Sequence, residues 1–264
     1  MANFTAKDVA TLRQMTGAGL LDCRNALEEA DGDIDKAAQI LREKGLAGAA
    51  KRSDREAAEG AVAAVRSGDA AAIVELRCET DFVAKSDEFV ALDDELAALV
   101  AAKGEEAVGE LDEEIERLRT TLKENISVGR VRRLVAESGQ VVDTYVHRQN
   151  DRGVNAVAIV LEGGSEELAH DIAVHVAFTK PAYLSRDEVP ADEVATERAT
   201  LETISRNEGK PEAALEKIVE GRLTGWFKDR VLLEQGYVRD EKQTIASMLG
   251  SARIVAFAQV VIGA

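Results

Sequence analysis

A single junction organises the chain: Cys78-Glu79-Thr80-Asp81-Phe82-Val83-Ala84-Lys85, where a mostly apolar run at 71–76 gives way to a segment of helical periodicity beginning at Ser86. This pattern predicts a strand followed by a helix. Thr80 or Asp81 is placed to cap the helix, because either side chain accepts a hydrogen bond from a backbone N–H. Two hypotheses stand for Phe82. Its ring packs onto the core as a hydrophobic staple, or it points outward.

Strand periodicity precedes the junction, and helical periodicity follows it. Residues 61–65 and 71–78 alternate as two strands around a turn at 67–69, which predicts a β-hairpin. The apolar positions from Phe89 to Val100 have helical spacing, and 110–126 reads as a second, highly charged helix.

The same order of elements returns further along the chain. Strand patterns at 128–134 and 141–147 flank a turn at Ser138-Gly139, and 154–161 forms another strand before a helix capped by Ser165. Strands joined by tight turns and covered by helices predict an α+β layer architecture. We expect two similar core subdomains of antiparallel sheets covered by helices. They are predicted at 61–138 and at 139–189 with 231–264, the last strand being 254–262.

Residues 190–230 are helical alone. Two narrow apolar stripes flank the turn at 207–211, and the outer faces are charged. This is typical of an αα-hairpin. We predict an antiparallel coiled coil that projects from the core and is inserted between two of its strands.

The N-terminal residues 1–50 contain three short helical patterns, separated by Gly17-Ala18-Gly19 and Asp31-Gly32-Asp33. Their arrangement resembles the ubiquitin-associated type of domain, a binding module. Residues 47–60 turn Ala-rich and charged without sustained periodicity, so 51–60 is predicted to be a linker.

Composition limits the function. The chain has 264 residues, of which 45% are hydrophobic but only 4% aromatic, and its net charge is −16. A surface this acidic repels phosphate backbones, so direct nucleic-acid binding is not expected. Neither an export leader nor an apolar run of ~18 residues is present, which favours a cytoplasmic protein that does not cross a membrane. Cys23 and Cys78 are predicted to be buried thiols rather than a disulfide.

The titratable residues do not converge on a catalytic or metal site. His170 and His175 lie about 140° apart around a helix, which does not fit a zinc helix. Acidic pairs such as Asp93-Asp94 are neighbours along helices, where side chains diverge. Gly17-Ala18-Gly19 lacks the strand and third glycine of a dinucleotide fingerprint. We therefore expect no enzyme, no cofactor and no metal.

Several motifs together carry a resemblance that covers nearly the whole chain. Thr80-Asp81-Phe82-Val83 and Thr16-Gly17-Ala18-Gly19-Leu20-Leu21-Asp22-Cys23 resemble the bacterial elongation factor Ts family, the guanine-nucleotide exchange factors of elongation factor Tu. Gly32-Asp33-Ile34, Gly209-Lys210-Pro211 and the run 218–222 match in the family's order.

The resemblance implies a role in translation elongation and protein biosynthesis, with elongation factor Tu as the partner. It implies that Phe82 inserts as a wedge near the magnesium side of the partner's nucleotide domain, and that Asp81 positions it. Dimerisation through the coiled-coil hairpin is implied as well. Further partner contacts are implied for residues across the chain: Leu12, Leu20, Leu21, Ile126, His147, Tyr237 and Val238.

Two departures and one alternative accompany the resemblance. Many members continue beyond the last strand, whereas this chain stops at Ala264, so we expect contacts of such an extension to be absent. Ala256 stands where an arginine is common. The alternative is an adaptor or scaffold whose coiled coil dimerises it and whose partner is not a GTPase. It predicts binding without nucleotide exchange.

Overall fold

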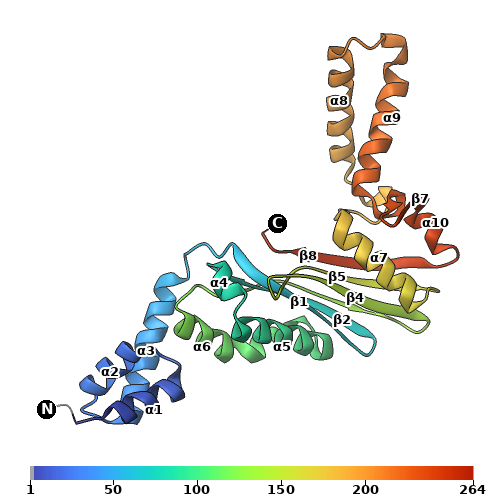
Figure 1. The fold of residues 1–264 in the computed structure, drawn as a ribbon. Coiled ribbons are helices and arrows are strands. Elements are labelled where there is room, and N and C mark those ends of the chain that lie inside the picture. The colour runs from blue at the N-terminus through green and yellow to red at the C-terminus, as the bar shows by residue number, and fades with distance from the viewer. Residues whose placement is uncertain (1–2, 264) are drawn as a thin grey trace.

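The computed structural model describes residues 3–263. A helical bundle, a core of two sheets and a projecting helical hairpin succeed one another along an elongated molecule (Figure 1). All pairings between named strands are antiparallel, and helices cover the sheets. The predicted α+β class is confirmed.

The N-terminal bundle consists of α1 (Ala6–Thr16), α2 (Leu20–Glu29) and α3 (Ile34–Arg52). Thr5 and Asp8 form a capping box at the start of α1, and Gly17 ends it with a φ of +67° that favours glycine. Small side chains let the helices approach closely around a compact core, whose buried members include Leu12, Cys23, Ala26, Leu27 and Ala37.

The third helix is longer than predicted. Residues 47–52, assigned to an irregular segment, continue α3 to Arg52, because Ala, Lys and Arg are strong helix formers even without an apolar stripe. Only 53–58 separate it from the first strand. The linker predicted at 51–60 therefore begins inside α3, to which its first two residues belong. Its last residues belong to β1.

The first sheet has the order β1-β2-β3, built from β1 (Glu59–Ser67), β2 (Ala70–Cys78) and β3 (Ser127–Val135). The predicted hairpin between the first two strands is confirmed. The outer face is covered by α5 (Asp87–Lys103) and α6 (Asp112–Leu122), with the 3₁₀ helix η1 (Glu105–Leu111) between them. The helix predicted for 110–126 is thus shorter than expected, because Lys123 adopts a left-handed conformation (φ +59°) that ends it.

The second sheet has the order β4-β5-β8, built from β4 (Gln140–Gln149), β5 (Arg152–Glu162) and β8 (Arg253–Val261). Its outer face is covered by α7 (Glu166–Thr179), which Ser165 caps as predicted. The strands on either side of Ser138-Gly139 do not pair with each other: β3 pairs with β2, and β4 with β5. That turn passes between the sheets instead of closing a hairpin.

The inner faces of the two sheets pack on each other through small apolar side chains such as Ala71, Ala156 and Val160. An ion pair of the first sheet, between Glu75 of β2 and Arg130 of β3, faces the second sheet. Arg130 donates to Glu75 from Nε and Nη2, both at 2.9 Å, and Nη2 also reaches the Val261 carbonyl of the other sheet at 2.5 Å. Burial alone would raise the pKa of Glu75, but the hydrogen bonds from arginine outweigh it and lower that pKa to about 2.

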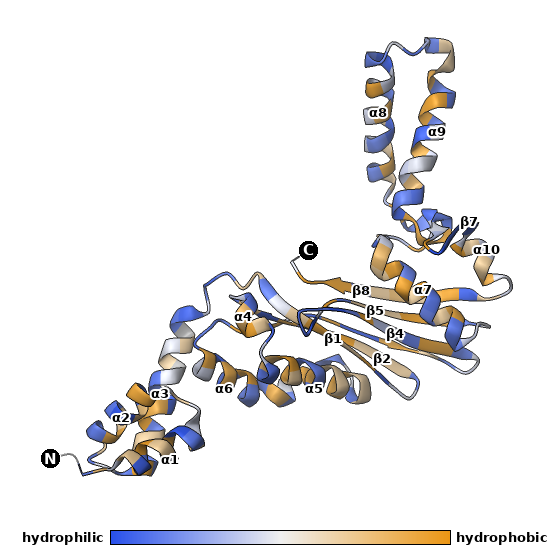
Figure 2. Cartoon of the chain, in the orientation of Figure 1, coloured by the Kyte–Doolittle hydropathy of each residue, from blue (hydrophilic) through white to orange (hydrophobic). Residues whose placement is uncertain are grey.

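The predicted αα-hairpin is present as α8 (Ala191–Asn207) and α9 (Glu212–Arg230). Hydrophilic and hydrophobic residues alternate along both helices (Figure 2). The two ends of the hairpin meet at its base, where the amides of Ala182 and Tyr183 donate to the Arg230 carbonyl at 2.9 and 3.1 Å.

Several short elements were not predicted, the first at the junction after β2 and the others around the base of the hairpin. They are α4 (Asp81–Ala84), η2 (Arg186–Glu188), η3 (Leu232–Glu234), β6 (Gly236–Tyr237), β7 (Asp240–Thr244) and α10 (Ile245–Leu249). Within residues 3–263, every helix is too short or too polar to cross a membrane.

Candidate partner-binding surfaces

The junction after β2 folds into a separate helical turn before α5 begins. Thr80 caps α4, because its extended backbone turns the Oγ1 toward the Val83 amide, from which it accepts a hydrogen bond at 3.4 Å. The Thr80 carbonyl accepts the Ala84 amide at 3.1 Å. Of the two predicted caps, Thr80 is the one used.

Phe82 lies on the outside of this turn and is 74% exposed. Ala84 is buried and Val83 packs against the same core, while the buried aromatic ring of this region belongs to Phe89. The hypothesis that Phe82 is a staple on the core is therefore wrong, and the outward orientation is confirmed.

Two neighbouring charges fix the environment of the exposed ring. The Lys85 Nζ lies 4.4 Å from the centroid of the Phe82 ring and 3.1 Å from Asp81 Oδ2. A cation over an aromatic face is attracted by the ring quadrupole. Asp81 thus holds Lys85, and Lys85 covers one face of the ring.

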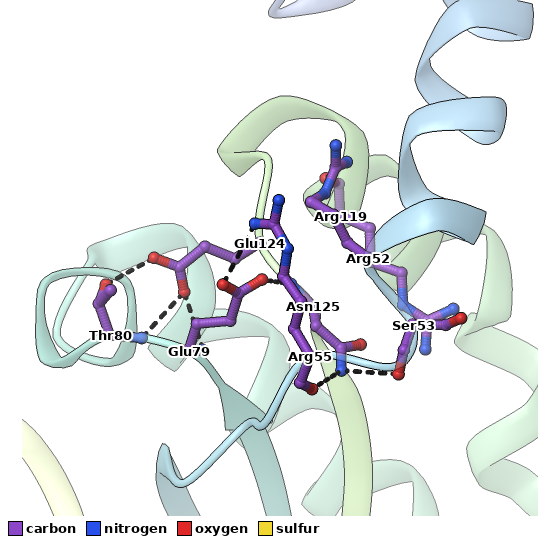
Figure 3. Close-up of polar contacts among 8 residues, drawn as sticks. All are labelled: Arg52, Ser53, Arg55, Glu79, Thr80, Arg119, Glu124 and Asn125. Carbon is purple, nitrogen blue, oxygen red and sulfur yellow. Dashed lines mark hydrogen bonds and ion pairs between the residues drawn. The ribbon is translucent and has the colours of Figure 1, made fainter.

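A carboxylate from another part of the chain holds the start of the turn (Figure 3). Glu124 Oε2 accepts the amides of Glu79 at 3.0 Å and Thr80 at 3.1 Å, and Oε1 accepts the Thr80 hydroxyl at 2.5 Å. Charge-assisted bonds of this kind are about twice as strong as neutral ones. The sequence prediction missed Glu124, because it placed this residue inside a helix.

A second exposed apolar surface lies on the N-terminal bundle. Leu20 and Leu21 are 61% and 66% exposed at the first turn of α2, and Met15 at the end of α1 is exposed too. Met15 stands three positions after Leu12 in α1 but does not face the bundle core with it. Leu12 is fully buried, so the structure does not support a direct partner contact through its side chain.

Comparisons with known proteins give the family of the chain. The family model described as Elongation factor TS matches residues 79–264. An elongation factor Ts of Clavibacter michiganensis subsp. michiganensis is 49% identical over 278 aligned residues that cover all of both chains. That of Micrococcus luteus is 45% identical over the same coverage, and that of Mycobacterium ulcerans is 47% identical over 96% of this chain and 95% of the relative.

The chain belongs to the elongation factor Ts family. This makes it a translation elongation factor. Of the further contact positions expected from the elongation factor Ts resemblance, Ile126 is fully buried against the first sheet. A side-chain contact at Ile126 is not supported, because the chain leaves α6 at Lys123 and turns this residue inward before β3.

The second subdomain presents a groove of about 540 Å³ beside His147, an exposed residue for which the elongation factor Ts resemblance implied a partner contact. Phe178 of α7 also lines this groove and is 77% exposed. The sequence analysis did not identify Phe178 as exposed, because a phenylalanine near the end of an amphipathic helix usually belongs to the core.

Tyr237 and Val238 lie against the same helix α7, but Tyr237 is buried and Val238 half-buried. The Val238 amide donates to His175 Nδ1 at 3.4 Å, so His175 Nε2 carries the proton and donates to Gln235 Oε1 at 3.0 Å. Burial lowers the pKa of His175, which keeps the ring neutral. Direct contact through the Tyr237 ring is therefore not supported, and Val238 is the more accessible of the pair.

The two cysteines are free and buried, as predicted. Burial is the largest influence on both, and it raises the pKa of Cys78 to about 12. A thiol with such a pKa is not a nucleophile at neutral pH.

Proposed function

We propose that this protein binds elongation factor Tu and accelerates the release of GDP from it, so that GTP can take its place. The observation that carries the proposal is the exposed Phe82 on a capped, charge-held turn. A large apolar ring kept in water contributes little to its own fold, and such a side chain is a typical anchor of a binding surface. Membership in the elongation factor Ts family supports elongation factor Tu as the partner.

Linkage explains how binding alone would release a nucleotide. If the exchange factor and GDP each weaken the other's affinity for the partner, the same coupling free energy acts in both directions. A tight nucleotide-free complex then implies a weakened nucleotide. No covalent chemistry and no cofactor are needed, so we infer that the protein is not an enzyme in the sense of making or breaking bonds.

We assign separate roles to the surfaces. Phe82, with Thr80, Asp81 and Val83 shaping its turn, inserts near the magnesium side of the nucleotide domain. Leu20 and Leu21 grip the same domain elsewhere. His147 and Val238 contact another domain of elongation factor Tu from the second subdomain.

The hairpin is proposed to mediate self-association. Its helices stand away from the core (Figure 1), and Ile204 is an exposed apolar residue on α8. Sedimentation of the protein at rising concentration tests this role. A monomer at all concentrations contradicts it.

The decisive test measures release of a fluorescent GDP analogue from elongation factor Tu. We expect wild type to accelerate release and Phe82→Ala to lose most of the acceleration while melting at nearly the same temperature. Val135→Ala is the matched control, since it removes another exposed apolar side chain from a strand end. Binding without acceleration by wild type would favour the adaptor instead.

A further inference from the structure

The loop after α6 binds two parts of the chain at once. Helix α6 ends at Lys123, whose left-handed backbone sends the following residues back toward the end of β2. The ladder of the first sheet stops at Cys78 on one side and Arg77 on the other, so the amides of Glu79 and Thr80 have no strand partner. Glu124 supplies the missing acceptors for both. Unpaired amides at this position would cost about 1–3 kcal/mol each if buried.

Asn125 extends the connection to the segment between α3 and β1 (Figure 3). Its backbone N–H donates to Glu79 Oε1 at 2.7 Å. Its side-chain Nδ2 donates to the backbone carbonyls of Ser53 at 3.1 Å and Arg55 at 2.7 Å. Arg55 in turn pairs with Glu79 at 3.4 Å. The connecting segment 53–58 is therefore tied at its start to the Phe82 turn.

The N-terminal bundle rests on the same end of α6. Lys123 pairs with Asp22 of α2 at 2.7 Å, and Arg52 donates to the Arg119 carbonyl at 3.1 Å. Gly45 lets the helices touch, because a Cβ there would lie only 2.3 Å from Thr120 Cγ2.

Adjacent residues thus hold the two surfaces that the proposed function uses. Lys123 holds Asp22, directly after Leu21, whereas Glu124 holds Thr80, two residues before Phe82. The Lys123 pair is exposed on both sides and contributes little by itself. Glu124 makes three hydrogen bonds, so it should hold the Phe82 turn more firmly than Lys123 holds Asp22.

We propose that Glu124 is a positioning residue for nucleotide release: it fixes the Phe82 turn on the end of α6, where the N-terminal bundle is also seated, so that both surfaces meet the partner in one preset geometry. The proposal rests on the proposed function. A turn that had to be ordered during insertion would lose binding free energy to conformational entropy at the moment of release.

The first experiment separates positioning from binding. GDP release is measured over a range of concentrations of this protein, which gives the maximal rate (kcat) and the concentration for half-maximal rate (KM). We expect Glu124→Ala to lower kcat by about tenfold or more with KM changed less than about threefold, because the N-terminal surface is intact. Glu124→Gln should recover most of kcat, since the amide oxygen accepts the two backbone amides and its NH₂ donates to the Thr80 hydroxyl.

The control is Glu113→Ala, which removes an exposed acid from α6, the helix that precedes Glu124. It should leave both constants unchanged. If Glu124→Ala matches wild type while wild type is active, the positioning role is overturned and the proposed function stands. If wild type fails to accelerate release, both are overturned.

The second experiment uses the free protein and needs no partner. Hydrogen exchange of the amides at 79–83 should accelerate about tenfold in Glu124→Ala and return toward wild type in Glu124→Gln, with the β2 amides equally protected in all three. Equal exchange at 79–83 in wild type and Glu124→Ala would show that the carboxylate does not hold the turn, which overturns the proposal.

Discussion

The two halves of the core repeat one arrangement, and they differ in how the β-hairpin is connected to the covering helix. In each, a β-hairpin is followed by a helix that covers the outer face of the sheet: β1, β2 and α5 in the first, β4, β5 and α7 in the second. The second half needs only residues 163–165 to pass from strand to helix, and Ser165 caps the helix at once. The first half uses 79–86, which makes room for α4 and Phe82. The scaffold is shared, and the candidate functional residue lies in the added turn.

The largest effect should come from comparing two phenylalanines, Phe82 inside this added turn and Phe89 in the helix α5 that follows it. Phe89→Ala should lower the free energy of unfolding by about 3–5 kcal/mol, since it leaves a cavity under the first sheet, whereas Phe82→Ala should cost less than about 1 kcal/mol. Urea denaturation of both variants measures the difference. Similar losses in the two would mean that the added turn belongs to the core of its subdomain.

The next largest effect tests whether Glu75 holds Arg130, which joins the two halves at the Val261 carbonyl. The depressed pKa of Glu75 means that its stabilisation is present above pH 4.5 and is lost as pH falls toward about 2. Glu75→Gln should lower stability at pH 7 by roughly 3 kcal/mol and should remove that part of the acid dependence. The exposed pair Glu162–Arg253 of the second sheet gives the control. Glu162→Gln should change stability by less than about 1 kcal/mol, and an equal effect of the two would refute the joining role.

A smaller effect distinguishes the buried titratable residues of the covering helices. His175 of α7 has a partner on each ring nitrogen, while Asp93 of α5 is buried with no partner for Oδ1 among the described residues. Burial raises the pKa of Asp93 well above its usual value. The folded state then keeps a proton that the unfolded state loses, so Asp93 makes stability fall as pH rises above about 3.8, by at most about 1.4 kcal/mol per pH unit.

The stability of Asp93→Asn should therefore increase relative to that of wild type as pH is raised from 4 to 7. Thermal denaturation of both proteins measures this. Asp94→Asn is the control, because this neighbour is half-exposed and faces Arg148 at 3.7 Å. A constant difference between Asp93→Asn and wild type across this pH range would show that Asp93 is ionised in the fold.

The smallest effect is expected from the hairpin, which the first half lacks. Replacing residues 195–221 with a short Gly-Ser linker keeps Val194, Leu223 and Phe227, which pack at its base. Stability and GDP release should change little, since loop closure costs little and the base is held by backbone bonds. Circular dichroism and the release assay measure this. A large loss of release would make the hairpin part of the partner surface.

The sequence predicted the local elements well but not their long-range partners. Alternation and caps predicted the strand pairs and the Ser165 start of α7, because these signals are contained in neighbouring residues. The pairing of β3 with β2 joins residues far apart in the chain, and periodicity carries no information about such a choice. Elements as short as β6 and α10 are too brief to form a periodic pattern.

The candidate site was predicted through resemblance more than through physics. Local pattern allowed Phe82 to be buried or to point outward and favoured the buried orientation, whereas the match of Thr80-Asp81-Phe82-Val83 to a known family favoured exposure. The same resemblance pointed to Leu12 and Ile126, whose burial in the structure follows from the bundle core and from the end of α6. Finding Glu124 would have required knowing that the helix ends at Lys123. No sequence signal indicates this end, because a lysine is not a typical residue for a left-handed helix cap.

The position of β8 at the end of the chain has a consequence for synthesis. The strands of the first sheet are all present once residue 135 has left the ribosome, whereas β5 must wait for β8, with the whole hairpin made in between. During that interval one edge of β5, a run of residues 156–161 that is buried in the final fold, has no neighbour. Unpaired apolar edges invite association with other chains. The nascent second half is therefore the part of this protein with most need of a chaperone.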